Sequence, residues 1–136
     1  MRIVLDTNVL VSGLLNPDGT PGRILDWILA GRLHILYDDR ILAEYSDVLM
    51  RPKFGFSQDL ARAVIGYLRL SGESVTALPL SEGLLPDPDD RPFAEVARSG
   101  GAEALVTGNQ EHFAGLEAHG IHVLSPSALL DLLRQE

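Results

Sequence analysis

Short apolar runs alternate with longer amphipathic segments along this sequence, and that alternation limits the folds open to it. Four apolar runs, at 2–5, 34–37, 104–106 and 121–124, predict buried strands, and 74–77 is a weaker strand candidate. Apolar residues recur at helical spacing in 20–31, 38–51, 57–70 and 92–99, and a last helix begins at Pro126. Strands that alternate with helices form βαβ units. The pattern therefore predicts an α/β fold, a three-layer α/β/α sandwich around a central, mainly parallel sheet, with residues 1–136 as one domain.

Polar residues directly follow three of the predicted strands. These are Asp6-Thr7-Asn8, Asp38-Asp39 and Thr107-Gly108-Asn109. Because the carboxyl ends of parallel strands lie along one edge, where open α/β sheets bind ligands, we expect these residues to share a site. Carboxylates gathered there would repel one another unless a cation neutralised them. Oxygen ligands without cysteine or clustered histidine suit Mg²⁺ or Mn²⁺.

Five carboxylates are the candidate ligands. Asp6 ends the first strand, and the alternative is that it only caps the helix that follows. Glu44 lies at the margin of the apolar arc of helix 38–51, where a carboxylate can point into a cleft, although most such glutamates are solvated. Asp87, Asp89 and Asp90 precede the helix near Pro92. One acid would satisfy that helix dipole, so three adjacent acids indicate a functional role for at least one of them.

The net charge of the chain is −8, and residues 71–136 carry three bases against eleven acids. An acidic chain is a poor candidate for a passive nucleic-acid binder and a fair one for binding cations. The absence of cysteine excludes disulfides and thiolate metal sites and is compatible with a cytoplasmic protein. No apolar run approaches the about 18 residues of a membrane helix, and Asp6 interrupts the apolar start too early for a signal peptide. The sequence also lacks a dinucleotide-binding fingerprint, a P-loop and a nucleophile elbow.

Several blocks of the sequence together resemble the PIN-domain nucleases. The blocks are Ile-Val-Leu-Asp-Thr-Asn-Val-Leu-Val-Ser at 3–12, then 41–45, 51–55, Asp-Pro-Asp-Asp-Arg-Pro-Phe at 87–93, and Leu-Val-Thr-Gly-Asn at 105–109. They occur in the expected order and span nearly the whole chain. The likeness is greatest to small prokaryotic PIN proteins (VapC-like) described as toxin components of toxin–antitoxin pairs.

This resemblance implies an endoribonuclease that hydrolyses phosphodiester bonds of single-stranded RNA with one or two Mg²⁺ or Mn²⁺ ions. Asp6, Glu44 and Asp90 would be the catalytic acids and metal ligands, and Asp89 or Asp87 could take the place of Asp90.

Further polar residues would support those acids. Thr7 and Asn8 would orient Asp6, with Thr107 and Asn109 as additional orienting residues. Many PIN domains place a fourth acid in the block where this chain has Asn109 and His112. Asn109 adds no charge, so the resemblance leaves one ion or two open.

Substrate and partners follow from the same resemblance. The bases expected to contact RNA, each of which could instead lie on a solvated helix face, are Arg23, Arg40, Arg51, Lys53 and Arg62. A cognate antitoxin and a homodimer are the expected protein partners, with helices at 24–29 or 57–70 supplying the dimer face, and no membrane association is expected. The alternatives are a catalytically weak PIN module that binds protein or RNA, and a DNA-directed nuclease.

Overall fold

The computed structural model describes residues 1–135 and confirms the α/β fold. Its sheet has five strands in the order β3-β2-β1-β4-β5, and every neighbouring pair is parallel. The strands are β1 (Arg2–Leu5), β2 (His34–Tyr37), β3 (Glu73–Ser74), β4 (Ala104–Val106) and β5 (Val123–Leu124). The prediction of a mainly parallel sheet is therefore confirmed.

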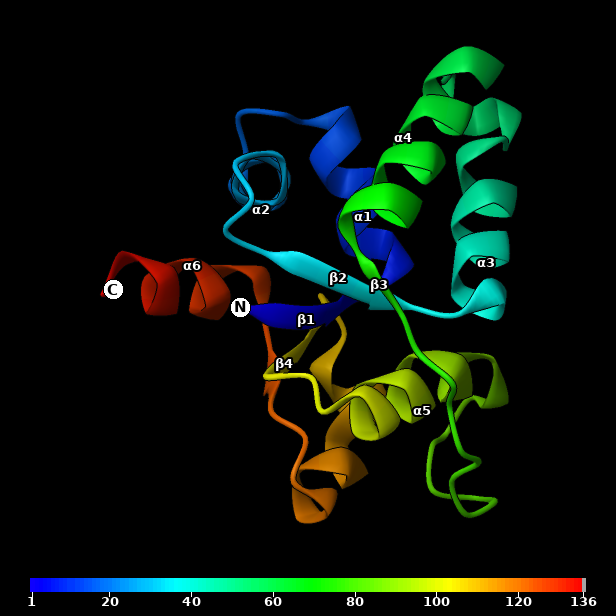
Figure 1. Cartoon of the computed structure of the whole chain (residues 1–136), viewed down its shortest axis with the longest axis vertical. Helices are drawn as coiled ribbons and strands as arrows, with labels where there is room; N and C mark the ends of the chain where they lie inside the picture. The colour runs from blue at the N-terminus through cyan, green and yellow to red at the C-terminus, as the bar shows by residue number, and fades with distance from the viewer. Residues whose placement is uncertain (136) are drawn as a thin grey trace.

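Helices cover both faces of this sheet. The α-helices are α1 (Thr7–Leu15), α2 (Thr20–Leu29), α3 (Asp39–Leu49), α4 (Gln58–Ser71), α5 (Arg91–Gly100) and α6 (Pro126–Arg134). Shorter 3₁₀ segments are η1 (Pro52–Phe54), η2 (Pro88–Asp90) and η3 (Gln110–His119). Figure 1 shows α1 to α4 on one side of the sheet and α5 on the other, while α6 packs against α2 and β5.

Local sequence explains where several helices begin. The side chains of Asp38, Ser57 and Ser125 each accept a hydrogen bond from a backbone N–H in the first turn of the helix that follows. These caps satisfy donors that a helix start leaves free. The helix starts predicted from Asp38-Asp39, Ser57 and Pro126 are therefore confirmed.

The central strands are apolar on both faces. Ile3, Val4 and Leu5 of β1 are completely buried, as are Leu105 and Val106 of β4. Continuous apolar runs, without alternation, are typical of parallel strands that helices cover from both sides. Within residues 1–135, no helix has the length and apolar character needed to cross a membrane.

The order in which strands are added to the sheet reverses between β1 and β4, and this reversal places the site. From β1 the chain proceeds to β2 and β3 on one side, whereas β4 and β5 lie on the other. Leu5 pairs with Val106, and the Asp6 N–H donates a 2.9 Å hydrogen bond to the Val106 carbonyl. Open α/β sheets bind ligands at such a switch point. Asp6 and Thr107, the first residues beyond these two strands, therefore meet there.

Two strand predictions and one loop differ from the structure. The weak candidate at 74–77 is shorter and begins earlier, as β3, and the strand expected at 121–124 is reduced to Val123–Leu124. Residues 110–119, for which the sequence predicts no element, form the kinked 3₁₀ segment η3. Gly115 and Gly120 in and after that segment weaken any helical pattern, which explains why periodicity does not reveal it.

Candidate active site

Asp6 is the buried acid at the centre of the site. Its side chain is held by the Thr107 hydroxyl, which donates a 2.7 Å hydrogen bond to Asp6 Oδ2. The backbone of Asp6 occupies the N-cap position of α1, yet its carboxylate accepts no capping hydrogen bond. Side-chain capping of α1 therefore does not account for the position of this carboxylate. The residue is 7% exposed, so a carboxylate lies almost entirely inside the protein.

Glu44 comes from the middle of α3 and is held beside Asp6 by two contacts. The hydroxyl of its buried neighbour Tyr45 donates a 2.5 Å hydrogen bond to the carbonyl of Leu5, the last residue of β1. This bond fixes α3 against the strand end that carries Asp6. Glu44 Oε2 accepts a hydrogen bond from the Thr7 hydroxyl at the start of α1.

These contacts revise the support expected around Asp6. The resemblance predicts that Thr7 and Asn8 orient this acid. The backbone N–H groups of both residues lower the pKa of the Asp6 carboxyl, while the Thr7 hydroxyl donates to Glu44. Thr107 orients Asp6, and the backbone N–H of Asn109 donates a 3.0 Å hydrogen bond to the Thr107 hydroxyl oxygen. The two threonines thus each hold one acid.

The acidic run 87–90 contains three carboxylates in different environments. Asp87 is exposed and its Oδ1 accepts a 2.9 Å hydrogen bond from the Asp89 N–H, so it caps η2. Asp89 is also exposed. Asp90 is the least exposed of the three, and its Oδ2 is buried without a hydrogen-bond partner among the described residues. His112 Nδ1 lies 3.6 Å from that oxygen.

A cleft of about 290 Å³ brings these acids together. All five predicted acids line it, together with two of the predicted bases and Asn109. The lining residues are Asp6, Thr7, Asn8, Glu44, Val48, Arg51, Lys53, Phe54, Asp87, Asp89, Asp90, Asn109 and His112. Residues from the β1–α1 junction, α3, η1, the acidic run and the start of η3 therefore meet at the carboxyl edge of the sheet.

Burial raises the pKa of three of these carboxyl groups, and repulsion between acids adds to the rise in two of them. Burial raises the pKa of Asp6, and the Thr107 hydroxyl offsets part of that rise. Burial also raises the pKa of Glu44, to which the Asp6 charge adds, against the hydrogen bond from Thr7. The pKa of Asp90 rises to about 6, first through burial and then through the charges of Asp6 and Asp87. A cation bound among these groups would remove the cause of the repulsion.

The donor set fits a hard divalent cation. It consists of carboxylate oxygens and the amides of Asn8 and Asn109, which are ligands that Mg²⁺ and Mn²⁺ prefer. The Oδ2 of Asp90 accepts no hydrogen bond within residues 1–135, and its nearest charged neighbour is His112 Nδ1 at 3.6 Å. In that part of the chain, no three His, Asp or Glu side chains yet lie as close as a metal ion's ligands do. Asp6 and Glu44 are instead tied to their threonines, so ion binding requires small side-chain movements.

The predicted basic residues divide into two groups. Arg51 and Lys53 line the cleft, where Arg51 pairs with Asp47 at 3.3 Å and the Lys53 ammonium lies 5.0 Å from the centre of the Phe54 ring. The other three bases do not line the cleft. Arg23 is exposed on α2 and Arg62 is exposed on α4. Arg40, near the start of α3, pairs with Asp38 and with Glu95 of α5.

The structure also identifies residues that the sequence did not. His112 lies beside Asp90, although its spacing from the other histidines suggests no role. Glu95 is a buried carboxylate on α5. Its position next to Val96 and Ala97 on an apolar helix face is a signal that could have revealed it, because buried charges are rare unless they are paired.

Comparison with known proteins gives two matches. A model of the PIN domain matches residues 2–111, a range that contains every acid of the cleft. An uncharacterized protein of Methanocaldococcus jannaschii is 31% identical over 113 residues, and the match covers 82% of this chain and 72% of the archaeal protein.

Proposed function

This chain belongs to the PIN domain family, a nuclease-type family, and from that membership we propose that it is a Mg²⁺- or Mn²⁺-dependent endoribonuclease acting on single-stranded RNA. The observation that carries the proposal is the meeting of Asp6, Glu44 and Asp90, from three separate elements, in one cleft. An unpartnered buried oxygen on Asp90 supports a ligand role for that residue.

Asp6, Glu44 and Asp90 would hold the ion, with Asp87, Asp89 and Asn109 at the edge of the site. PIN domains typically bind Mg²⁺. A bound divalent cation supplies a water of lowered pKa and polarises the scissile phosphodiester. The hydroxyls of Thr7 and Thr107 keep two of the acids in place before the substrate arrives.

Arg51 and Lys53 are the residues that we propose to contact the RNA backbone. They lie on the cleft wall close to the acids, where their positive charges attract phosphates that the acids alone would repel. The Lys53 ammonium group lies over the Phe54 ring, so it is partly ordered before RNA binds. A single strand fits this narrow cleft more readily than a duplex, which favours unpaired RNA.

Cleavage of a single-stranded RNA in Mn²⁺ tests the proposal, with Asp6→Asn as the variant. We expect the wild type to cut internally and the variant to lose nearly all activity, because the central ligand loses its charge. Asp131→Asn, which changes an exposed acid on α6, is the matched control and should cut as the wild type does. Equal residual cleavage by the wild type and Asp6→Asn would contradict the nuclease proposal.

Asn109 supports a second candidate, a catalytically weak module that binds RNA or protein. Its amide stands in the cleft where many PIN domains carry a fourth acid. RNA binding without Mn²⁺-dependent cleavage would favour this candidate. The acid cluster also suits DNA as a substrate, so competition between RNA and DNA strands of one sequence decides between the two polymers.

We further propose that the protein is the toxin of a toxin–antitoxin pair and forms a homodimer. The acids outside the cleft, mostly in residues 71–136, suit a basic antitoxin segment. An apolar groove of about 260 Å³ between α1, α2 and α4 includes the helices predicted to supply a dimer face. A small reading frame beside the gene, encoding a DNA-binding segment, would support the toxin assignment.

A further inference from the structure

An ion network centred on the buried Glu95 joins the segments that carry Glu44 and Asp90. Glu95 lies on α5, is 4% exposed, and has the buried neighbours Ala94 and Val96 on either side. A carboxylate in such surroundings is stable only when donors compensate it. Nothing in the proposed chemistry uses Glu95, so its burial needs another explanation.

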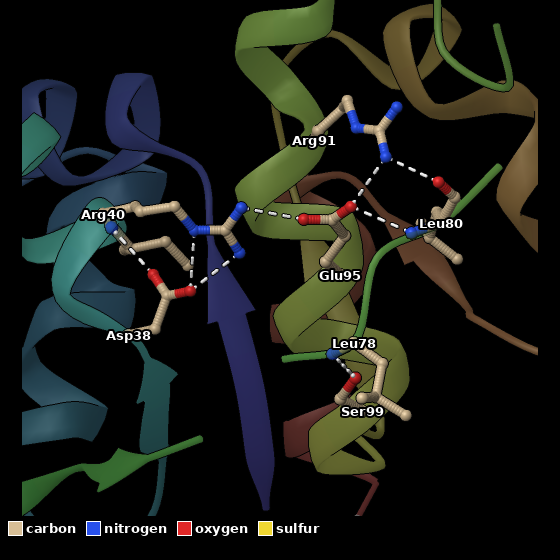
Figure 2. Close-up of polar contacts among 8 residues, drawn as sticks. Asp38, Arg40, Leu78, Leu80, Arg91, Glu95 and Ser99 are labelled. Carbon is tan, nitrogen blue, oxygen red and sulfur yellow. Dashed lines mark hydrogen bonds and ion pairs between the residues drawn. The ribbon is translucent and has the colours of Figure 1, made fainter. Parts of the chain in front are cut away.

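Three donors surround the Glu95 carboxylate (Figure 2). Arg40 Nη1 lies 2.8 Å from Oε1, while the Leu80 N–H and Arg91 Nη2 lie 2.9 Å and 3.0 Å from Oε2. Arg91 Nη2 also donates a 2.5 Å hydrogen bond to the Leu80 carbonyl, so both backbone polar groups of Leu80 are fixed. Arg40 is held from its other side by Asp38, at 2.9 Å from Nε and 2.8 Å from Nη2.

Each partner of Glu95 belongs to a segment that leads to a cleft acid. Arg40 lies on α3, one turn before Glu44. Arg91 directly follows Asp90. Leu80 is the last residue before the loop that returns the chain to the acidic run.

Glu95 is not part of the cleft lining, so any effect on the site passes through these partners. Its ion pair with Arg40 connects α3 directly to α5. Its contacts with Leu80 and Arg91 close the loop at both of its ends.

We propose that Glu95 is a positioning residue, which fixes α3 against α5 and so sets the separation of Glu44 and Asp90. The inference rests on the proposed metal-dependent function of the cleft. Mutation of residues that orient metal ligands from behind typically lowers metal affinity by about 10- to 100-fold. The proposal also changes the role expected for Arg40, whose Nε, Nη1 and Nη2 all face Asp38 or Glu95. Arg40 therefore serves to join the two helices and does not contact RNA.

Calorimetric titration with Mn²⁺ tests the positioning role with Glu95→Gln. The amide keeps the shape of the side chain but loses the charge that both arginines require. We expect this variant to keep the far-ultraviolet circular dichroism of the wild type and to bind Mn²⁺ about 10-fold more weakly. Glu73→Gln is the matched control, because Glu73 pairs with Arg2 at 2.9 Å on the edge strand, away from the cleft. That control should bind Mn²⁺ as the wild type does.

The outcomes separate positioning from simple stabilisation. A Glu95→Gln protein that unfolds more easily but binds Mn²⁺ with wild-type affinity would overturn the proposal. If the wild type itself binds no Mn²⁺, the proposed function fails. Amide hydrogen exchange of residues 88–93 then tests whether Glu95 positions this segment. Faster exchange there in Glu95→Gln than in Glu73→Gln supports positioning, and equal exchange contradicts it.

Arg40→Met is a second variant in case Glu95→Gln does not fold. It removes one donor and leaves the contacts of Glu95 with Leu80 and Arg91 in place. We expect weaker Mn²⁺ binding but an unchanged dependence of RNA affinity on salt, whereas Arg51→Met should reduce the slope of that dependence by about 1. Wild-type Mn²⁺ affinity in Arg40→Met, or a reduced salt slope, would contradict the assignment.

Discussion

Asp90 is the residue at which the proposed function conflicts most directly with stability. Its buried Oδ2 accepts no hydrogen bond among the described residues, and burial, followed by the charges of neighbouring acids, raises the pKa of its carboxyl to about 6. In the unfolded chain an aspartate has a pKa of about 3.9. Because the folded-state pKa is the higher one, ionisation of Asp90 lowers the free energy of unfolding.

Asp90→Asn should therefore stabilise the metal-free protein while weakening Mn²⁺ binding. We expect a gain of about 1–2 kcal/mol above about pH 6 in the presence of a chelator, since the amide carries no charge into the cleft. The gain should shrink as the pH falls through about 6 and disappear below about pH 4, where the carboxyl group is protonated in both states. Urea unfolding across this pH range measures it.

The control for this prediction is Asp131→Asn, an exposed acid whose side chain is 72% accessible. Its unfolding free energy should match the wild type to within about 0.5 kcal/mol. A destabilised Asp90→Asn protein at neutral pH would show that the carboxylate is satisfied in the folded protein.

The sequence identified the acids of the cleft but not their individual environments. Asp87, Asp89 and Asp90 are equivalent by residue type, and only the 3₁₀ turn over Pro88–Asp90 turns one of them inward. Asp6 followed from its place at a strand end. The pairing of each threonine with an acid depends on contacts between residues distant in sequence, such as Thr107 with Asp6, which no local pattern encodes.

At the scale of elements, Tyr45 determines where α3 sits. Its hydroxyl is buried and bonded to the carbonyl of Leu5 at the end of β1. Tyr45→Phe should lower the free energy of unfolding by about 1–2 kcal/mol, because it leaves a buried carbonyl without that donor. We also expect weaker Mn²⁺ binding, since α3 carries Glu44. Urea unfolding and calorimetry measure the two effects.

Tyr67→Phe is the matched control for this change. The Tyr67 hydroxyl is 3.4 Å and 3.5 Å from the carbonyls of Ile28 and Leu29, and the residue is 38% exposed. Loss of these long contacts should change the free energy of unfolding by less than about 0.5 kcal/mol. Equal losses in both variants would mean that the Tyr45 bond does not anchor α3.

The sequence predicts the helices and strands that have strong local signals, and it predicts less well those whose bounds depend on tertiary contacts. The capped helix α4 and the apolar strand β4 match the sequence pattern closely. The edge strands β3 and β5 have two residues each, because pairing with β2 and β4 alone defines them. The sequence does not predict the ion network of Glu95, because its partners Arg40 and Leu80 approach it only in the folded chain.

At the scale of the whole molecule, the acidity of the chain no longer argues against a nucleic-acid substrate. Five of its nineteen acids line one cleft. A bound divalent ion reverses the sign of charge that a phosphate meets there. Arg51 and Lys53 stand on the wall of the same cleft and add positive charge.

The homodimer proposal depends on the apolar groove between α1, α2 and α4. Leu29 lines this groove and is 64% exposed, so together with its apolar neighbours it offers a contiguous apolar surface to a partner. Residues 20–70 carry seven bases and six acids, so two copies of this face would not repel each other. A second copy therefore suits the groove better than a strongly charged partner does.

Leu29→Glu should convert the dimer to a monomer, as measured by sedimentation or light scattering at micromolar concentration. The substituted carboxylate would have to be buried in the interface without a partner, which strongly opposes association. Leu78→Glu is the control, because Leu78 is 72% exposed but lies near Ser99 on α5, away from the groove. That variant should remain dimeric. A monomeric wild type, or dissociation by Leu78→Glu alone, would show that the groove is not the dimer face.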